Sequence, residues 1–342
     1  MSLRSPLQMF SAVSGVRDVL IKRDDLLEYG DAKGVKGNKG RKLYGLMQQN
    51  WKNSVLVSYG GTQSNAMNAL SLLACSKQVP FVYYHRMTRN KPKTGNWQLC
   101  QQRSMITCEL DEKQYEALTG PTFFQPHMKF HQLSEALLKT RNFSSYSLPV
   151  DSILDYEVKY IKQGGADPIS SLGLTVLATE LVEQTKSSKE NFVIALPCGT
   201  GTTALYLAKH INEMDAKHIS RVVPIPCVGG YSVLWKQMQK LEPNFMLNPL
   251  LYWLDQSDIC KHPFAKCDKR DLSMWKELTD STGIEFDLIY APRTWRAIAA
   301  SIDKITDYGK LKLIYIHTGG VEGNSSQLER YGMIAQSVTE YH

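Results

Sequence analysis

The sequence lacks the features that mark membrane, secreted and zinc-binding proteins. No apolar run approaches the length of a bilayer, so no membrane partner is expected. The first residues, MSLRSPLQMFSAVSG, contain no continuous apolar stretch, so no signal peptide is expected. The seven cysteines form no Cys-x-x-Cys pair and no zinc pattern, which predicts no metal site and reduced thiols in a cytoplasmic protein.

A concentrated basic surface is also lacking. The net charge of +7 is mild, because 40 Lys and Arg residues are scattered among 33 acidic residues. This balance favours anionic small-molecule ligands and predicts no nucleic-acid partner. The chain has 342 residues, of which 43% are hydrophobic. A chain of this length usually exceeds one core, so we expect two domains.

What the sequence does contain is an alternation of short apolar runs with longer amphipathic ones. Strands are predicted at 54–60, 80–86, 105–110, 192–198, 221–229 and 312–318. Helices are predicted at 64–77, 127–141, 169–186, 202–213, 231–241, 271–282, 293–306 and 325–338. This alternation is typical of α/β layers around mostly parallel sheet.

A lysine-rich turn stands out near the N-terminus. The stretch KGVKGNKGRKL, residues 33–43, holds five cationic residues and three glycines. Three explanations compete: a solvated run of charges, a binding site for phosphate or nucleic acid, or one lysine that serves as an amine nucleophile.

Three apolar strands run directly into glycines and then a helix, in 55–70, 193–208 and 313–324. Ligands of open α/β sheets collect at such strand ends. The turn CGTGTT, 198–203, offers backbone N–H groups and three hydroxyls without a charged side chain, which suits either a phosphate monoester or a plain Thr-capped turn. A phosphate-bearing cofactor with a reactive lysine would use all these features, and pyridoxal phosphate is such a cofactor.

The motifs GNKGRKL, 37–43, and SYGGTQSN, 58–65, together resemble the 1-aminocyclopropane-1-carboxylate deaminase and D-cysteine desulfhydrase family. These are pyridoxal-phosphate enzymes of the tryptophan-synthase-β-like class. Supporting matches are GNWQL (95–99), DPISSLGL (167–174), TGIEFDLIY (282–290) and HTGG (317–320). The resemblance implies a two-domain α/β fold of type II with open, mostly parallel sheets, and a homodimer. It implies a large cofactor domain, 1–43 plus 163–342, and a smaller inserted α/β domain, 44–162.

The resemblance also implies roles for individual residues. Lys39 is similar to the Schiff-base lysine, which answers the question of the lysine-rich turn for one residue, while Lys33 and Lys36 are expected to be solvated. The implied cofactor-binding residues are Asn38, Lys39, Lys42, Asn65, Gly199, Thr200, Gly201, Thr202, Thr203 and Thr318. The implied substrate-binding residues are Gln63, Ser64 and Asn65, and the implied catalytic residues are Lys39, Ser64 and Tyr290.

The sequence departs from the family at Ala291. Deaminases of the family have a glutamate there, which meets the pyridine nitrogen, and desulfhydrases place Thr-Gly where Ala291-Pro292 stands. Without that acid the ring is a weaker electron sink, and HTGG resembles the desulfhydrase branch. The sequence therefore favours α,β-elimination from D-cysteine to pyruvate, ammonia and sulfide. The alternatives are ring opening of 1-aminocyclopropane-1-carboxylate to 2-oxobutanoate and ammonia, and a binding protein that keeps the fold without catalysis.

Overall fold

The computed structural model describes residues 4–29, 32, 34–87, 94–120, 124–125, 127–139, 153–259 and 262–339. The chain divides into two compact units, each with its own sheet and hydrophobic core. Unit 1 comprises Met1–Gly30, Lys36–Leu46 and Ala166–His342, and unit 2 comprises Asp31–Val35 and Met47–Gly165.

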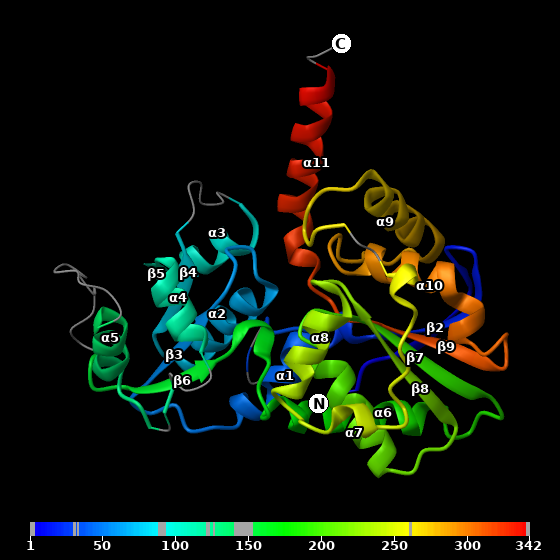
Figure 1. Ribbon diagram of the computed structural model, residues 1–342, viewed down its shortest axis with the longest axis horizontal. Helices are drawn as coiled ribbons and strands as arrows, with labels where there is room; N and C mark the ends of the chain where they lie inside the picture. The colour runs from blue at the N-terminus through cyan, green and yellow to red at the C-terminus, as the bar shows by residue number, and fades with distance from the viewer. Residues whose placement is uncertain are drawn as a thin grey trace. The chain divides into compact units, whose positions relative to one another are not determined.

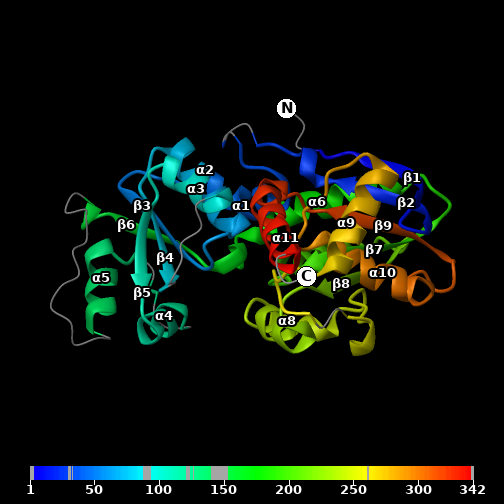
Figure 2. The same ribbon diagram turned by 90° about the horizontal axis from the view of Figure 1, so that it is seen from above.

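Unit 1 is built on a five-stranded sheet in the order β1-β2-β9-β7-β8 (Figures 1 and 2). The strands are β1 (Leu7–Val13), β2 (Val16–Arg23), β7 (Asn191–Cys198), β8 (Ile219–Pro226) and β9 (Leu311–His317). The neighbours from β2 to β8 are parallel, and β1 pairs antiparallel with β2. Positive φ at both Ser14 (47°) and Gly15 (80°) makes the tight hairpin turn between β1 and β2.

Helices cover both faces of this sheet. The helices of unit 1 are α1 (Gly37–Met47), α6 (Ser170–Thr185), α7 (Thr202–Glu213), α8 (Gly230–Gln239), α9 (Lys269–Thr282), α10 (Ala291–Ile305) and α11 (Asn324–Thr339). Figure 1 shows α9 and α10 on one face and α6 and α7 on the other. The strands β7 and β9 are almost fully buried between these layers, which explains their continuous apolar sequences.

Unit 2 is a parallel four-stranded sheet in the order β5-β4-β3-β6. Its strands are β3 (Ser54–Tyr59), β4 (Phe81–Arg86), β5 (Ile106–Leu110) and β6 (Glu157–Ile161). Its helices are α2 (Asn65–Lys77), α3 (Gly95–Gln102), α4 (Glu112–Thr119) and α5 (Phe130–Lys139). Figure 2 shows α2 and α3 on one face of this sheet and α4 and α5 on the other.

The predicted α/β class with mostly parallel sheet is confirmed, and every predicted strand and helix has a counterpart. The last two residues of the helix predicted at 127–141 lie outside the described residues. The sequence patterns did not predict β1, β2, β6, α1, α3 or α4. The missed elements that we can explain are exposed or short: β1 has only one buried residue, and α3 and α4 span eight residues each. Within the described part of the chain, no helix is long and apolar enough to cross a membrane.

Candidate active site

In unit 1 the lysine-rich turn is the N-terminus of α1, and it lies against the end of β9. The backbone N–H of Asn38 donates a hydrogen bond to the carbonyl of Thr318, with an N–O distance of 3.1 Å. Gly37 has φ +60°, and a Cβ there would lie 2.7 Å from the same carbonyl. Only glycine therefore lets the two segments approach this closely. The side chains of Lys39 and Lys42 follow on the first turns of α1.

The turn between β7 and α7 forms the second wall of the site. Gly201 precedes α7 with φ +74°, and the first-turn residues Thr202 and Thr203 are buried. The hydroxyl oxygens of Thr200 and Thr202 lie 2.9 Å apart, and the ammonium of Lys42 lies 3.5 Å from the Thr200 hydroxyl. A helix N-terminus, hydroxyls and a lysine amine thus converge on one turn, which is an arrangement that binds phosphate.

Side chains from separate elements join these two walls. The Thr203 hydroxyl donates to the Asn38 side-chain oxygen at 3.0 Å, which links α7 to α1. The ring of Tyr290 lies against Gly199, because a Cβ at Gly199 would be 3.6 Å from the Tyr290 hydroxyl oxygen. Phe264 packs on the Tyr290 ring with centroids 5.3 Å apart. Burial raises the pKa of Tyr290, so its phenol stays neutral.

Burial also sets the charge of the two lysines. It lowers the pKa of Lys39, and the carboxylate of Asp287 opposes this effect. The pKa of Lys42 is lowered further, by burial and then by the positive charge of Lys39. A bound phosphate would raise the pKa of Lys42, since an adjacent anion favours the protonated form.

The turn before α10 contains a carboxylate that the sequence patterns did not single out. Asp287 is 4% exposed, and its carboxylate accepts hydrogen bonds from the N–H groups of Ile289 (3.2 Å), Tyr290 (2.6 Å) and Ala291 (3.2 Å). Burial raises the pKa of Asp287, although these hydrogen bonds counteract the shift. The side chain is therefore committed to the turn that orients Tyr290. A signal was available, since Asp287 lies three residues before the predicted tyrosine in the quoted DLIY motif.

In unit 2 the predicted substrate loop lies at the start of α2, at the carboxyl end of β3. The Ser64 hydroxyl caps the helix by accepting from the N–H of Met67 at 3.3 Å. Asn96, which the sequence analysis passed over within GNWQL, holds the loop. Its side-chain amide donates to the Asn65 side-chain oxygen (2.7 Å) and the Gln63 carbonyl (3.1 Å), and its N–H donates to the Gln63 side chain (3.0 Å).

The structure thus brings together Asn38, Lys39, Lys42, 199–203, Tyr290 and Thr318 in unit 1, and Gln63, Ser64 and Asn65 in unit 2. The Thr318 backbone, rather than its side chain, makes the hydrogen bond to α1. Lys36 is exposed, as predicted for a solvated lysine, and Lys33 lies outside the described residues.

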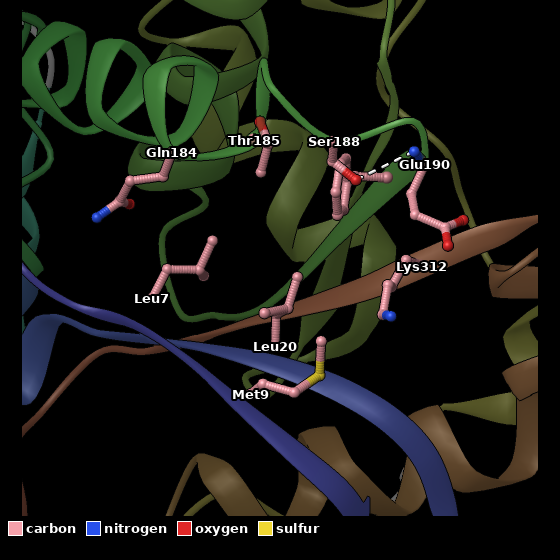
Figure 3. Close-up of a pocket in the computed structure, with 9 residues that line it drawn as sticks. Leu7, Met9, Leu20, Gln184, Thr185, Ser188, Glu190 and Lys312 are labelled. Carbon is pink, nitrogen blue, oxygen red and sulfur yellow. Dashed lines mark hydrogen bonds between the residues drawn. The ribbon is translucent and has the colours of Figure 1, made fainter.

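A pocket of about 330 Å³ opens elsewhere in unit 1 (Figure 3). Its lining residues are Leu7, Met9, Leu20, Gln184, Thr185, Ser188, Glu190, Phe192 and Lys312. Phe192 and Lys312 stand at the starts of β7 and β9, whereas the candidate site lies where those strands end. The pocket therefore lies apart from the candidate site.

The chain is similar over most of its length to curated proteins named as deaminases, and over about half of its length to one named as a desulfhydrase. A Pyrococcus horikoshii protein with the provisional name 1-aminocyclopropane-1-carboxylate deaminase is 24% identical, over 90% of this chain and 85% of that protein. A rice protein (Oryza sativa subsp. japonica) with the provisional name D-cysteine desulfhydrase 2, mitochondrial, is 24% identical over 51% of this chain and 45% of its own. No protein-family model matches the chain. The predicted resemblance is confirmed by these similarities.

Solved structures share the fold. An ACC deaminase homologue superposes with a TM-score of 0.69 at 22% identity, covering 96% of this chain and 94% of that one. Serine racemase from Dictyostelium discoideum superposes with a TM-score of 0.59 at 11% identity, covering 92% of each chain. The predicted fold, that of type II pyridoxal-phosphate enzymes, is confirmed.

Proposed function

We propose that this chain is a pyridoxal-phosphate-dependent lyase/deaminase that catalyses D-cysteine desulfhydrase-like α,β-elimination on a small amino acid. The observation that carries the proposal is the joining of α1, which carries Lys39 and Lys42, to the turn at 199–203. That turn fits a phosphate monoester, because it combines the α7 N-terminus with threonine hydroxyls and Lys42. The similarity to named deaminases and desulfhydrases supports the same class.

Each group of residues has a distinct task in this proposal. Lys42 and Thr200–Thr203 would hold the phosphate, and the Lys39 amine would hold the cofactor and accept the α-proton of the substrate. The bound cofactor supplies an electron sink for the α-carbon. Ser64 and its neighbours Gln63 and Asn65 bind the substrate carboxylate at the start of α2, where the helix dipole favours an anion.

The surroundings of Ala291 favour elimination over ring opening. Ala291 is 1% exposed and brings no acid to the site, and the carboxylate of Asp287 is engaged by three backbone N–H groups. The cyclopropane substrate has no α-proton to remove, and opening its ring needs a stronger electron sink. We therefore expect pyruvate from D-cysteine and no 2-oxobutanoate from 1-aminocyclopropane-1-carboxylate. Turnover of the cyclopropane alone would contradict this preference.

The cofactor assignment is tested by the visible absorption spectrum of purified protein before and after borohydride, for wild type and Lys39→Ala. We expect a band that borohydride removes in the wild type and that the variant lacks. No band after addition of pyridoxal phosphate would instead favour a binding protein without catalysis. The homodimer and the cytoplasmic location stay predictions, the first of which light scattering on the purified protein checks.

A further inference from the structure

Four charged side chains are buried together on the side of α1 away from the candidate site. Lys22, Asp24 and Arg41 are 0% exposed, and Glu180 is 5% exposed. They come from β2, the segment directly after it, α1 and α6. The formal charges cancel, since the group holds two cations and two carboxylates. We call these four residues the α1 anchor.

Arg41 is the centre of the α1 anchor. Its guanidinium donates to both oxygens of Asp24, at 2.7 and 2.7 Å, and to both oxygens of Glu180, at 3.0 and 2.9 Å. Lys22 donates to Glu180 at 2.5 Å and to the Ser5 carbonyl at 2.8 Å. Paired forks of this kind fix the orientation of a guanidinium as well as its distance.

Backbone packing fixes α1 at the same place. Gly173 of α6 lies so close that a Cβ there would be 1.9 Å from the Arg41 carbonyl oxygen. A Cβ at Gly40 would be 2.3 Å from the Tyr29 ring. The helix therefore has no room to slide or turn without losing its ion pairs.

Stability alone does not account for the α1 anchor. Burying four charges carries a large desolvation cost, and well-packed apolar residues in the place of a buried ionic network often leave stability unchanged or improve it. No member of the anchor is among the groups that shift the pKa of Lys39, which are its own burial and the carboxylate of Asp287. What paired forks do supply is a defined geometry.

The orientation of α1 also sets the directions of the two lysines of the site, because Lys39, Arg41 and Lys42 lie on the same helix. A helix turns by about 100° per residue, so Arg41 points about 160° away from Lys39 on the same helix. Fixing Arg41 therefore fixes the rotation of α1, and with it the directions of Lys39 and Lys42. We propose that Arg41, held by Asp24 and Glu180, is a positioning residue that aims Lys39 at the reacting atoms. The cofactor part of this inference rests on the proposed function.

The test replaces the α1 anchor with apolar residues in the full chain: Lys22→Met, Asp24→Leu, Arg41→Met and Glu180→Met together. The matched control is Lys304→Ala with Asp255→Ala, an exposed ion pair of unit 1 with an N–O distance of 2.7 Å. A milder variant, Arg41→Lys, keeps the charge and removes the forks. Three readouts are the denaturant midpoint, the ¹³C-methyl signal of reductively methylated Lys39 without cofactor, and borohydride trapping of pyridoxal phosphate on Lys39 by peptide mass.

We expect the fourfold variant to unfold cooperatively with an undiminished midpoint, to trap at least tenfold less cofactor on Lys39, and to shift the Lys39 methyl signal. Arg41→Lys should show a smaller loss, and the control none. Wild-type trapping with an unshifted signal in the folded fourfold variant would overturn the inference. If the fourfold variant does not fold, trapping and the Lys39 methyl signal are compared between Arg41→Lys and the wild type instead. Failure of Arg41→Lys to fold would also overturn the inference.

The methyl signal separates this inference from the proposed function. A wild type that never traps pyridoxal phosphate defeats the proposed function, but a shifted Lys39 signal in the fourfold variant would still support positioning by the α1 anchor. If both the wild type and the fourfold variant trap pyridoxal phosphate, the proposed function stands and positioning by the α1 anchor fails.

Discussion

Replacing Gly201 with alanine tests the phosphate turn most directly. The left-handed conformation at φ +74° costs a residue with a Cβ about 1 to 2 kcal/mol. The new Cβ would also lie 2.6 Å from Leu234 Cδ1 and 2.7 Å from Met238 Cγ, so the turn or these side chains must shift. A charge-assisted hydrogen bond contributes about 1.5 to 3 kcal/mol, and losing one to the phosphate weakens binding about tenfold or more.

A matched control isolates binding from backbone strain. Gly283, at the end of α9, has φ +67°, and a Cβ there would meet nothing within 4 Å. Gly283→Ala should therefore lose only the stability that the left-handed conformation costs, measured by urea unfolding, while it binds pyridoxal phosphate as the wild type does. Gly201→Ala should lose stability and raise the Kd for pyridoxal phosphate, measured by absorbance titration, about tenfold or more. An unchanged Kd in Gly201→Ala would refute the assignment of this turn to the phosphate.

Three further predictions concern the other parts of the site. Because burial lowers the pKa of Lys39, borohydride trapping of pyridoxal phosphate on Lys39 should increase with pH, with a midpoint below 10.5. Asp287→Asn should move that midpoint to a still lower pH, since the carboxylate of Asp287 raises the pKa of Lys39. A midpoint at higher pH in Asp287→Asn would contradict this direction. Ser64→Ala should lower the free energy of unfolding by about 1 kcal/mol through loss of the α2 cap, and it should raise KM for the amino acid; unchanged KM would remove Ser64 from substrate binding. Asn96→Ala should raise KM similarly with Ser64 intact, because Asn65 and Gln63 lose the side chain that holds them, whereas Asn50→Ala at an exposed position should leave KM unchanged.

The fold class was predictable because its signal is local. Continuous apolar runs such as 192–198 indicate strands buried on both faces, and glycine directly after them indicates a turn at the ligand-binding edge. The β1–β2 hairpin was missed for the opposite reason. Most of β1 is exposed or half-buried, so its composition lacks the apolar periodicity on which strand prediction depends.

The sequence by itself determined the residue types of the site. The motif around Lys39 and the threonines after Gly199 can be recognised in the chain without coordinates. Only the tertiary structure decided how they meet: that Asn38 bonds to Thr203, that Asp287 is engaged by its own turn, and that Arg41 faces two carboxylates on the far side of α1. Glu180 and Arg41 are 139 positions apart. No local pattern reports which distant charges will share a dry interior, because burial depends on how the helices and strands pack.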